Sequence, residues 1–262
     1  MVKAERDIRF HAGVYSKLNG KTHPAMLVIA RDAEGNIKAV QATYLDPLTH
    51  GKVDKSEVAI QKQTFGVMKG AAVTIRGNKH APTLIAEGIE TALSLKQALP
   101  DATVKVTLSK ANFKNIDPET LTAKTIFCLD CDGQDLKKDK VIHDATKRLL
   151  EANKQVAFMV PATHQQQKID YNDVLKTSGV KSIQHDFKHA ISVENFYGKG
   201  HELTLLAANK TTKLVEKATQ IYMAKQQNHI QHVNYYQTIN KENSRSELPI
   251  SPTKSVDMER SL

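Results

Sequence analysis

The sequence has 262 residues but no tryptophan, only two cysteines and only 5% aromatic residues. With so few aromatic side chains, extensive stacking against nucleic-acid bases is not expected. No apolar run approaches the ~20 residues of a membrane-spanning helix, and the N-terminus lacks the apolar core of a secretory signal. We therefore expect a cytoplasmic protein of one to two domains that makes no contact with a membrane.

The two cysteines, Cys128 and Cys131, have the C-x-x-C spacing of a redox motif or of half a zinc site. No second cysteine pair exists, and no nearby histidine spacing completes a zinc set. The alternative, which we favour, is a buried thiol at Cys128 and a loop thiol at Cys131 in a reducing compartment.

Acidic residues are outnumbered by basic ones, which gives a net charge of +9. Most of the basic excess lies before residue 84, whereas residues 84–187 are close to neutral. A basic segment beside a metal site is the pattern expected of a protein that follows a polyanion such as DNA. A generally lysine-rich composition is the alternative explanation.

The first part of the chain, residues 1–82, is predicted to be a small β-rich α+β subdomain. Two strands at 23–31 and 37–45 flank a turn that contains Asp-Ala-Glu-Gly-Asn. Residues 49–64 are polar and lysine-rich and are predicted to form a loop, and a short strand follows at 71–75.

Residues 83–187 are predicted to form an α/β domain because strands and helices alternate there. The strand at 125–129 is wholly apolar, which is typical of a parallel sheet covered on both faces. The expected elements are strands at 83–87, 102–108, 125–129 and 155–160, and helices at 89–99, 139–153 and 170–176. The third part, residues 188–262, is predicted to contain a helix at 202–227 and a disordered polar tail at 240–262.

Three carboxylates follow predicted strands of this domain: Glu87 in one segment, and Asp130 and Asp132 in another. Because the carboxyl ends of parallel strands meet at one sheet edge, we expect these side chains to converge there. Like charges in one place require a cation, and Mg²⁺ held by carboxylates usually meets phosphates. The plainer alternatives are a helix-start acid at Glu87 and a polar turn at Asp130 and Asp132.

Two more acids, Asp170 and Asp173, follow the last predicted strand of the domain. They are candidates for a fourth metal ligand, and a helix N-cap at Asp170 or Asn172 is the equal alternative.

Taken together, these segments resemble the Toprim domain, the catalytic module shared by bacterial-type primases, some topoisomerases and some nucleases. Ala86-Glu87-Gly88-Ile89-Glu90-Thr91-Ala92-Leu93-Ser94 is similar to the branch found in phage and plasmid primases and in the C-terminal regions of conjugative relaxases. Residues 8–80 also resemble the segment that precedes Toprim in that branch. The matching pieces are Arg9-Phe10-His11-x-Gly13-x-Tyr15, His23-Pro24-Ala25, Arg31-Asp32-x-x-Gly35, Thr43-Tyr44-Leu45-Asp46, Lys62 and Phe65-Gly66.

The resemblance implies a Rossmann-like, mostly parallel sheet with flanking helices and a site for Mg²⁺ or Mn²⁺. It implies that Glu87, Asp130 and Asp132 are both catalytic residues and metal ligands, assisted by Asp170 or Asp173. The implied activity is primase-like nucleotidyl transfer on DNA in plasmid or mobile-element replication or in conjugative transfer. A Toprim nuclease and a non-catalytic DNA-binding fragment of a relaxase or primase are the alternatives.

The sequence also departs from the family in several ways. It has no zinc module, no Walker A motif, no histidine cluster of the relaxase type and no tyrosine context typical of a topoisomerase nucleophile. Single-stranded DNA and nucleoside triphosphates are the expected partners, together with a relaxase or helicase of a transfer or replication complex.

Basic residues ahead of the acidic cluster are the candidates for contact with the nucleic acid, and solvent-exposed surface charges are the alternative for each of them. The candidates are Arg9, Arg31, Lys62, Lys69 and Arg76, with Lys52 and Lys55 in the same segment.

Overall fold

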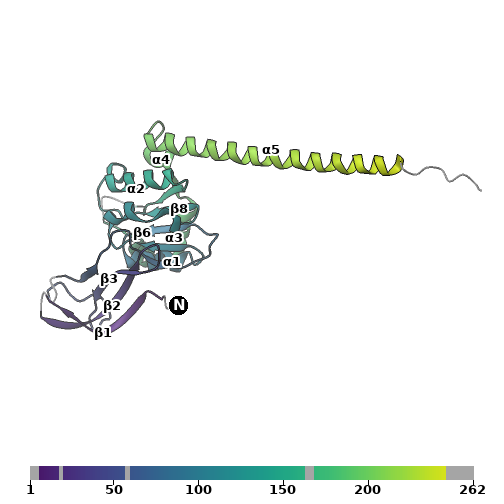
Figure 1. The fold of residues 1–262 in the computed structure, drawn as a ribbon. Helices are drawn as coiled ribbons and strands as arrows, with labels where there is room; N and C mark the ends of the chain where they lie inside the picture. The colour runs from purple at the N-terminus through teal and green to yellow at the C-terminus, as the bar shows by residue number, and fades with distance from the viewer. Residues whose placement is uncertain (1–5, 18–19, 57–59, 163–167, 246–262) are drawn as a thin grey trace, which may run out of the picture. The chain divides into compact units, whose positions relative to one another are not determined.

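The computed structural model describes residues 6–17, 20–56, 60–162 and 168–245 (Figure 1). The chain divides into two units, residues 1–210 and residues 211–262, which are described separately. The first unit contains two β-sheets and the candidate site. In the second unit, the described residues belong to the helix α5 (Glu202–Arg245), which begins in the first unit.

The first sheet is an antiparallel arrangement of four strands in the order in which they occur in the chain. They are β1 (Ile8–Ser16), β2 (Lys21–Arg31), β3 (Ile37–Tyr44) and β4 (Lys62–Gly66). The β2–β3 turn is held by Asp32, whose Oδ1 accepts the Asn36 amide at 2.7 Å. The strands predicted at 23–31 and 37–45 are confirmed. The loop predicted at 49–64 is wrong at its end, because β4 begins at Lys62 and pairs with β3.

The second sheet has six strands in the order β10-β9-β8-β6-β7-β5. Its four central strands are parallel, and the two outer strands run antiparallel to their neighbours. The predicted mostly parallel sheet is therefore confirmed. The strands are β5 (Val73–Ile75), β6 (Thr83–Ala86), β7 (Thr103–Val106), β8 (Lys124–Cys128), β9 (Gln155–Met159) and β10 (Ile191–Ser192).

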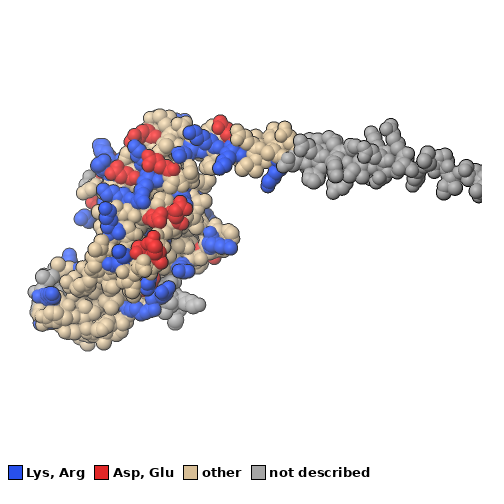
Figure 2. All heavy atoms as spheres, in the orientation of Figure 1, with Lys and Arg blue, Asp and Glu red and all other residues tan. Residues whose placement is uncertain are grey.

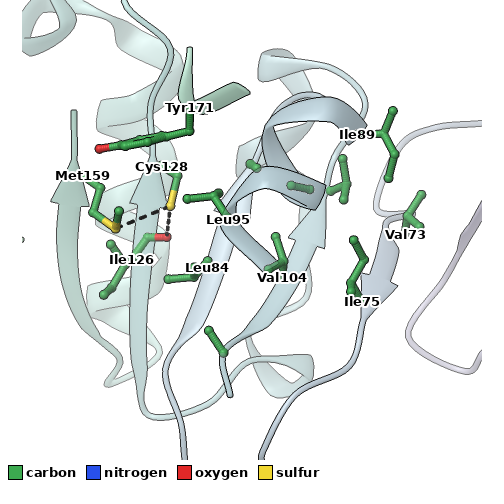
Figure 3. Packing of buried hydrophobic residues seen from close by; sticks show 14 of the residues in the cluster. Val73, Ile75, Leu84, Ile89, Leu95, Val104, Ile126, Cys128, Met159 and Tyr171 are labelled. Atoms are coloured by element: carbon green, nitrogen blue, oxygen red, sulfur yellow. Dashed lines mark hydrogen bonds between the residues drawn. The ribbon is translucent and has the colours of Figure 1, made fainter. Parts of the chain in front are cut away.

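Helices cover both faces of this sheet. On one face, α1 (Ile89–Ala98) and α3 (Tyr171–Lys188) pack against Leu84, Ile126 and Cys128 (Figure 3). On the other face, α2 (Lys140–Glu151), the 3-10 helix η1 (Lys110–Asn115) and α4 (Val193–Tyr197) pack against Ile85 and Phe127. Successive side chains of β6 and β8 thus enter opposite cores, which explains the unbroken apolar runs 84–86 and 126–128 in these strands. Each fully buried side chain of this size contributes about 1.5–3 kcal/mol.

The order of the strands creates a reversal point between β6 and β8. The chain leaves β6 through α1 to reach β7 on one side, and it leaves β8 through α2 to reach β9 on the other. The two strands end level with each other, because Ala86 pairs with Cys128. In open parallel sheets, ligands bind in the crevice beyond the strand ends at such a point.

Three differences from the predicted elements concern the later part of the chain. The short helix predicted at 170–176 is the start of α3, which continues to Lys188 past a kink at Gly179, where φ is +75°. The helix predicted at 202–227 continues as α5 to Arg245, so residues 240–245 of the predicted disordered tail are helical. The rest of that tail, 246–262, lies outside the described residues. Among the described residues, no helix combines the length and apolarity needed to cross a bilayer.

Candidate functional site

Glu87 and Asp130 lie next to each other at the reversal point of the second sheet. Glu87 directly follows β6, and Asp130 is the second residue after β8. Both line a cavity of about 270 Å³, together with Asp170 and Asn172 at the start of α3. The predicted convergence of the strand-end carboxylates is therefore seen for Glu87 and Asp130.

Asp130 is the carboxylate whose environment most disfavours its charge. Burial raises its pKa to about 7, and the nearby carboxylates of Asp170, Glu87 and Asp132 add to the effect. Its Oδ1 atom is buried and has no hydrogen-bond partner among the described residues. A buried carboxylate oxygen without a donor is costly, and a bound cation is one way to satisfy it.

Asp132 lies at the outer side of the same cluster and is partly exposed, with 43% of its side chain accessible. It lines a very small second cavity together with Glu87 and Asp130. Its Oδ2 is 3.4 Å from Nζ of Lys110, which is also 3.0 Å from Oδ2 of Asp139. The carboxylates suit Mg²⁺ or Mn²⁺ in their chemistry. Within the described ranges, however, no three acidic, histidine or cysteine side chains are arranged to hold a metal ion.

Asp170 and Asp173 together cap helix α3. A bridge between Cys131 and Ile169 brings this segment beside the Asp130 loop. Asp170 Oδ1 accepts the amides of Asn172 at 2.8 Å and Asp173 at 2.9 Å, and Asp173 Oδ2 accepts the Asp170 amide at 3.3 Å. The helix cap proposed as the alternative is therefore present. Asp170 also lines the cavity, whereas Asp173 is not among the lining residues.

Two lysines from the first part of the chain line the same cavity as the carboxylates. Lys62, at the start of β4, and Lys52 each form an ion pair with Glu90 in the first turn of α1, at 2.8 Å and 2.9 Å. Burial alone raises the pKa of Glu90, but the hydrogen bonds from Lys62 and Lys52 outweigh it and lower the pKa to about 2. The cavity is thus lined by both carboxylates and ammonium groups, a combination suited to a metal–phosphate group.

The other predicted nucleic-acid contacts lie away from this cavity. Arg31 is paired with Asp7 at 3.0 Å and donates to the carbonyl of Gly35, so it holds the first sheet together. Arg9, Lys69 and Arg76 are exposed. On the face seen in Figure 2, Lys and Arg are interspersed with Asp and Glu, so this face carries no continuous basic track within the described residues.

Two further charged residues at the site, Glu90 and Lys110, are not among the residues predicted from the sequence. A sequence signal existed for Glu90, since it lies three residues after Glu87, in the first turn of the helix that follows. No sequence signal pointed to Lys110, because its position depends on the path of the chain after β7.

Two family models match this chain. The family model described as "Toprim domain" matches residues 83–181. Residues 83–181 are therefore a Toprim domain, as the sequence motifs predicted. A second model, a domain of unknown function (DUF7146), matches residues 1–75. No curated protein matches the sequence.

Several solved primase structures resemble the chain. A DNA primase domain from Pseudomonas aeruginosa is 16% identical with a TM-score of 0.41, over 71% of this chain and 59% of that one. The Aquifex aeolicus primase, with its zinc-binding and RNA polymerase domains, is 15% identical with a TM-score of 0.45. The match covers 77% of this chain and 55% of that one. The RNA polymerase domain of Mycobacterium tuberculosis primase DnaG, in complex with double-stranded DNA, is 13% identical with a TM-score of 0.44. The match covers 71% of this chain and 60% of that one.

These structural likenesses have clear bounds. The chain spans 54% to 60% of the length of the first solved structures that it matches. At such low identities and TM-scores, the likenesses say nothing about activity.

Proposed function

We propose that this protein is a primase-like Toprim enzyme that transfers nucleotides on a DNA template with the help of Mg²⁺ or Mn²⁺. The observation that carries the proposal is the buried Asp130 Oδ1, which lacks a partner among the described residues and lies among Glu87, Asp132 and Asp170. Such a cluster is suited to a divalent cation, and the cavity that Glu87, Asp130 and Asp170 line is also lined by Lys52 and Lys62.

In this proposal, Glu87, Asp130 and Asp132 hold the cation, and Asp170 assists from the start of α3. A bound divalent cation neutralises charge on a phosphoryl group and lowers the pKa of the attacking oxygen. We assign Asp173 to the helix cap, because its Oδ2 accepts the Asp170 amide. Lys52 and Lys62 bind the triphosphate or the template backbone, and Glu90 holds the two ammonium groups in place.

The expected partners are single-stranded DNA and nucleoside triphosphates. A role in plasmid or mobile-element replication or in conjugative transfer, beside a relaxase or helicase, follows from the sequence resemblance and remains part of the proposal. The basic excess of the chain predicts DNA binding that weakens as the salt concentration rises and that shows little preference for a particular DNA sequence.

The test is Mg²⁺-dependent incorporation of labelled nucleotides on a single-stranded DNA template. Asp130→Ala should abolish incorporation while the circular dichroism spectrum stays unchanged. The matched control is Asp144→Asn on α2, a partly exposed acid paired with Lys140, which should retain incorporation. Incorporation by Asp130→Ala at the wild-type rate would remove the proposal.

The same preparation separates the alternatives. Cleavage of labelled single-stranded DNA with Mn²⁺ and no nucleoside triphosphate, lost in Asp130→Ala, would replace the primase proposal with a nuclease. DNA binding without either reaction, and without stabilisation by Mg²⁺, would indicate a non-catalytic DNA-binding module.

A further inference from the structure

Lys110 lies beside the proposed metal ligands and pairs with two carboxylates at once. Its Nζ is 3.4 Å from Asp132 Oδ2 and 3.0 Å from Asp139 Oδ2. The side chain is 26% exposed and lines the small second cavity together with Glu87, Asp130 and Asp132. Its ammonium group is therefore a positive charge already present at the edge of the acidic cluster.

The loop that carries Lys110 is held in place by hydrogen bonds. The amide of Thr107 donates to the carbonyl of Ala86 at 3.0 Å, which ties the end of β7 to the residue before Glu87. The buried Asn112 donates to the carbonyls of Ala71 at 2.8 Å and Thr107 at 3.2 Å. These hydrogen bonds hold the backbone on both sides of Lys110, the first residue of η1, so its side chain can change partners without a shift of the backbone.

The two partners of Lys110 differ in what else they do. Asp139 is the N-cap of α2, and its Oδ1 accepts the amides of Val141 and Ile142, so its position is set by the helix. Its Oδ2 is the closer partner of Lys110. Asp132 is partly exposed, has Lys110 as its ion-pair partner and belongs to the proposed ligand set. Asp139 is thus the partner that Lys110 can keep, and Asp132 is the partner that Lys110 can release.

We propose that Lys110 is a positioning residue that competes with the divalent cation for Asp132. In the metal-free protein its ammonium neutralises Asp132 and holds this carboxylate out of the ligand arrangement. When the cation binds, Lys110 releases Asp132 and stays on Asp139. The inference rests on the proposed metal site and on the two ion pairs of Lys110.

The test is the affinity of the full-length protein for Mn²⁺ alone, measured by electron paramagnetic resonance and by calorimetry. Lys110→Met should tighten the Kd for Mn²⁺ roughly three- to tenfold, because it removes a competing ion pair and a like charge. Lys110→Arg keeps the charge and should stay close to wild type. The matched control is Lys138→Met, which removes an 85% exposed lysine paired with Asp135 and should leave the Kd unchanged.

A double-variant cycle separates competition at Asp132 from a general electrostatic effect. In the Asp132→Asn background, Lys110→Met should lose most of its effect on the Kd, because the ion pair is already absent. A weaker or unchanged Kd in folded Lys110→Met, or the same tightening with Asp132→Asn, would overturn the inference. Nucleotide incorporation is measured separately, so a protein that binds Mn²⁺ without synthesising oligonucleotides would contradict the proposed function and leave the role of Lys110 intact.

Discussion

The carboxylate of Glu90 joins two parts of the molecule, since its Oε2 atom lies 2.8 Å from Nζ of Lys62. Lys62 begins the last strand of the first sheet, and Glu90 lies in the first turn of the helix that follows Glu87. With Lys52 on its other oxygen, Glu90 links the first sheet to the Toprim domain beside the proposed catalytic acids. One carboxylate therefore pairs with both Lys52 and Lys62, which line the cavity.

Replacing Glu90 should destabilise the protein. Glu90→Gln leaves Lys52 and Lys62 without their counter-ion in a site where the Glu90 side chain is only 23% exposed. We expect a loss of about 1.5–3 kcal/mol in the free energy of unfolding, the range for hydrogen bonds to charged groups. Urea denaturation measures it, and Glu34→Gln, at an exposed position in the β2–β3 turn, is the control.

The contribution of Glu90 should also depend on pH. Its pKa is lowered from 4.5 to about 2 in the folded protein, so the folded state favours the ionised form. The stabilisation is fully present above pH 4.5 and is lost as the pH falls through about 2. The difference in unfolding free energy between wild type and Glu90→Gln should therefore shrink below pH 4.5. A difference that grows on acidification would have the wrong sign for this ion pair.

Removing the charge of Asp130 should stabilise the metal-free protein. The raised pKa, about 7, means that folding disfavours the ionised carboxylate, and the penalty develops as the pH rises from 3.8 to above 7. At pH 8 in a chelating buffer, Asp130→Asn should have a higher melting temperature than the wild type. The corresponding gain in the free energy of unfolding is about 1–2 kcal/mol. Adding Mg²⁺ should raise the melting temperature of the wild type and leave that of the variant unchanged. Thermal scans with and without Mg²⁺ check both effects.

Substitutions of Asp170 and Asp173 should distinguish helix capping from metal binding. Asparagine is as good an N-cap as aspartate, so Asp170→Asn should keep the stability of α3 within a few tenths of a kcal/mol. If Asp170 assists the cation, the same variant should weaken Mg²⁺ binding several-fold. Asp173→Asn should leave Mg²⁺ binding unchanged. Calorimetry on both variants measures this difference, and equal effects would argue against the assignment of separate roles.

The alternating strands and helices allowed most of the second sheet to be predicted from the sequence. The apolar residues of 125–129 and the acids that follow them were sufficient to place Asp130 and Glu87 at one sheet edge, because parallel strands end on the same side. Strand β4 was missed because Lys62, Gln63 and Thr64 are polar; it is an outer strand of its sheet and leaves these side chains half-buried or exposed. Polar outer strands lack the alternation that makes inner strands recognisable.

The remaining details of the site depend on contacts between residues far apart in the sequence. The ion pair between Glu90 and Lys62 spans 28 positions, and the contact of Lys110 with Asp132 spans 22. No local periodicity encodes either of them. The same holds for Arg31, a predicted DNA contact, whose ion pair with Asp7 spans 24 positions.

The central claim is that a divalent cation binds between the ends of β6 and β8, and a crystal structure with Mn²⁺ tests it most directly. The account predicts an anomalous scattering peak at bonding distance from Glu87 and Asp130, with Asp132 released from Lys110. A Mn²⁺ peak elsewhere on the molecule, with Glu87 and Asp130 unliganded at saturating Mn²⁺, would contradict it.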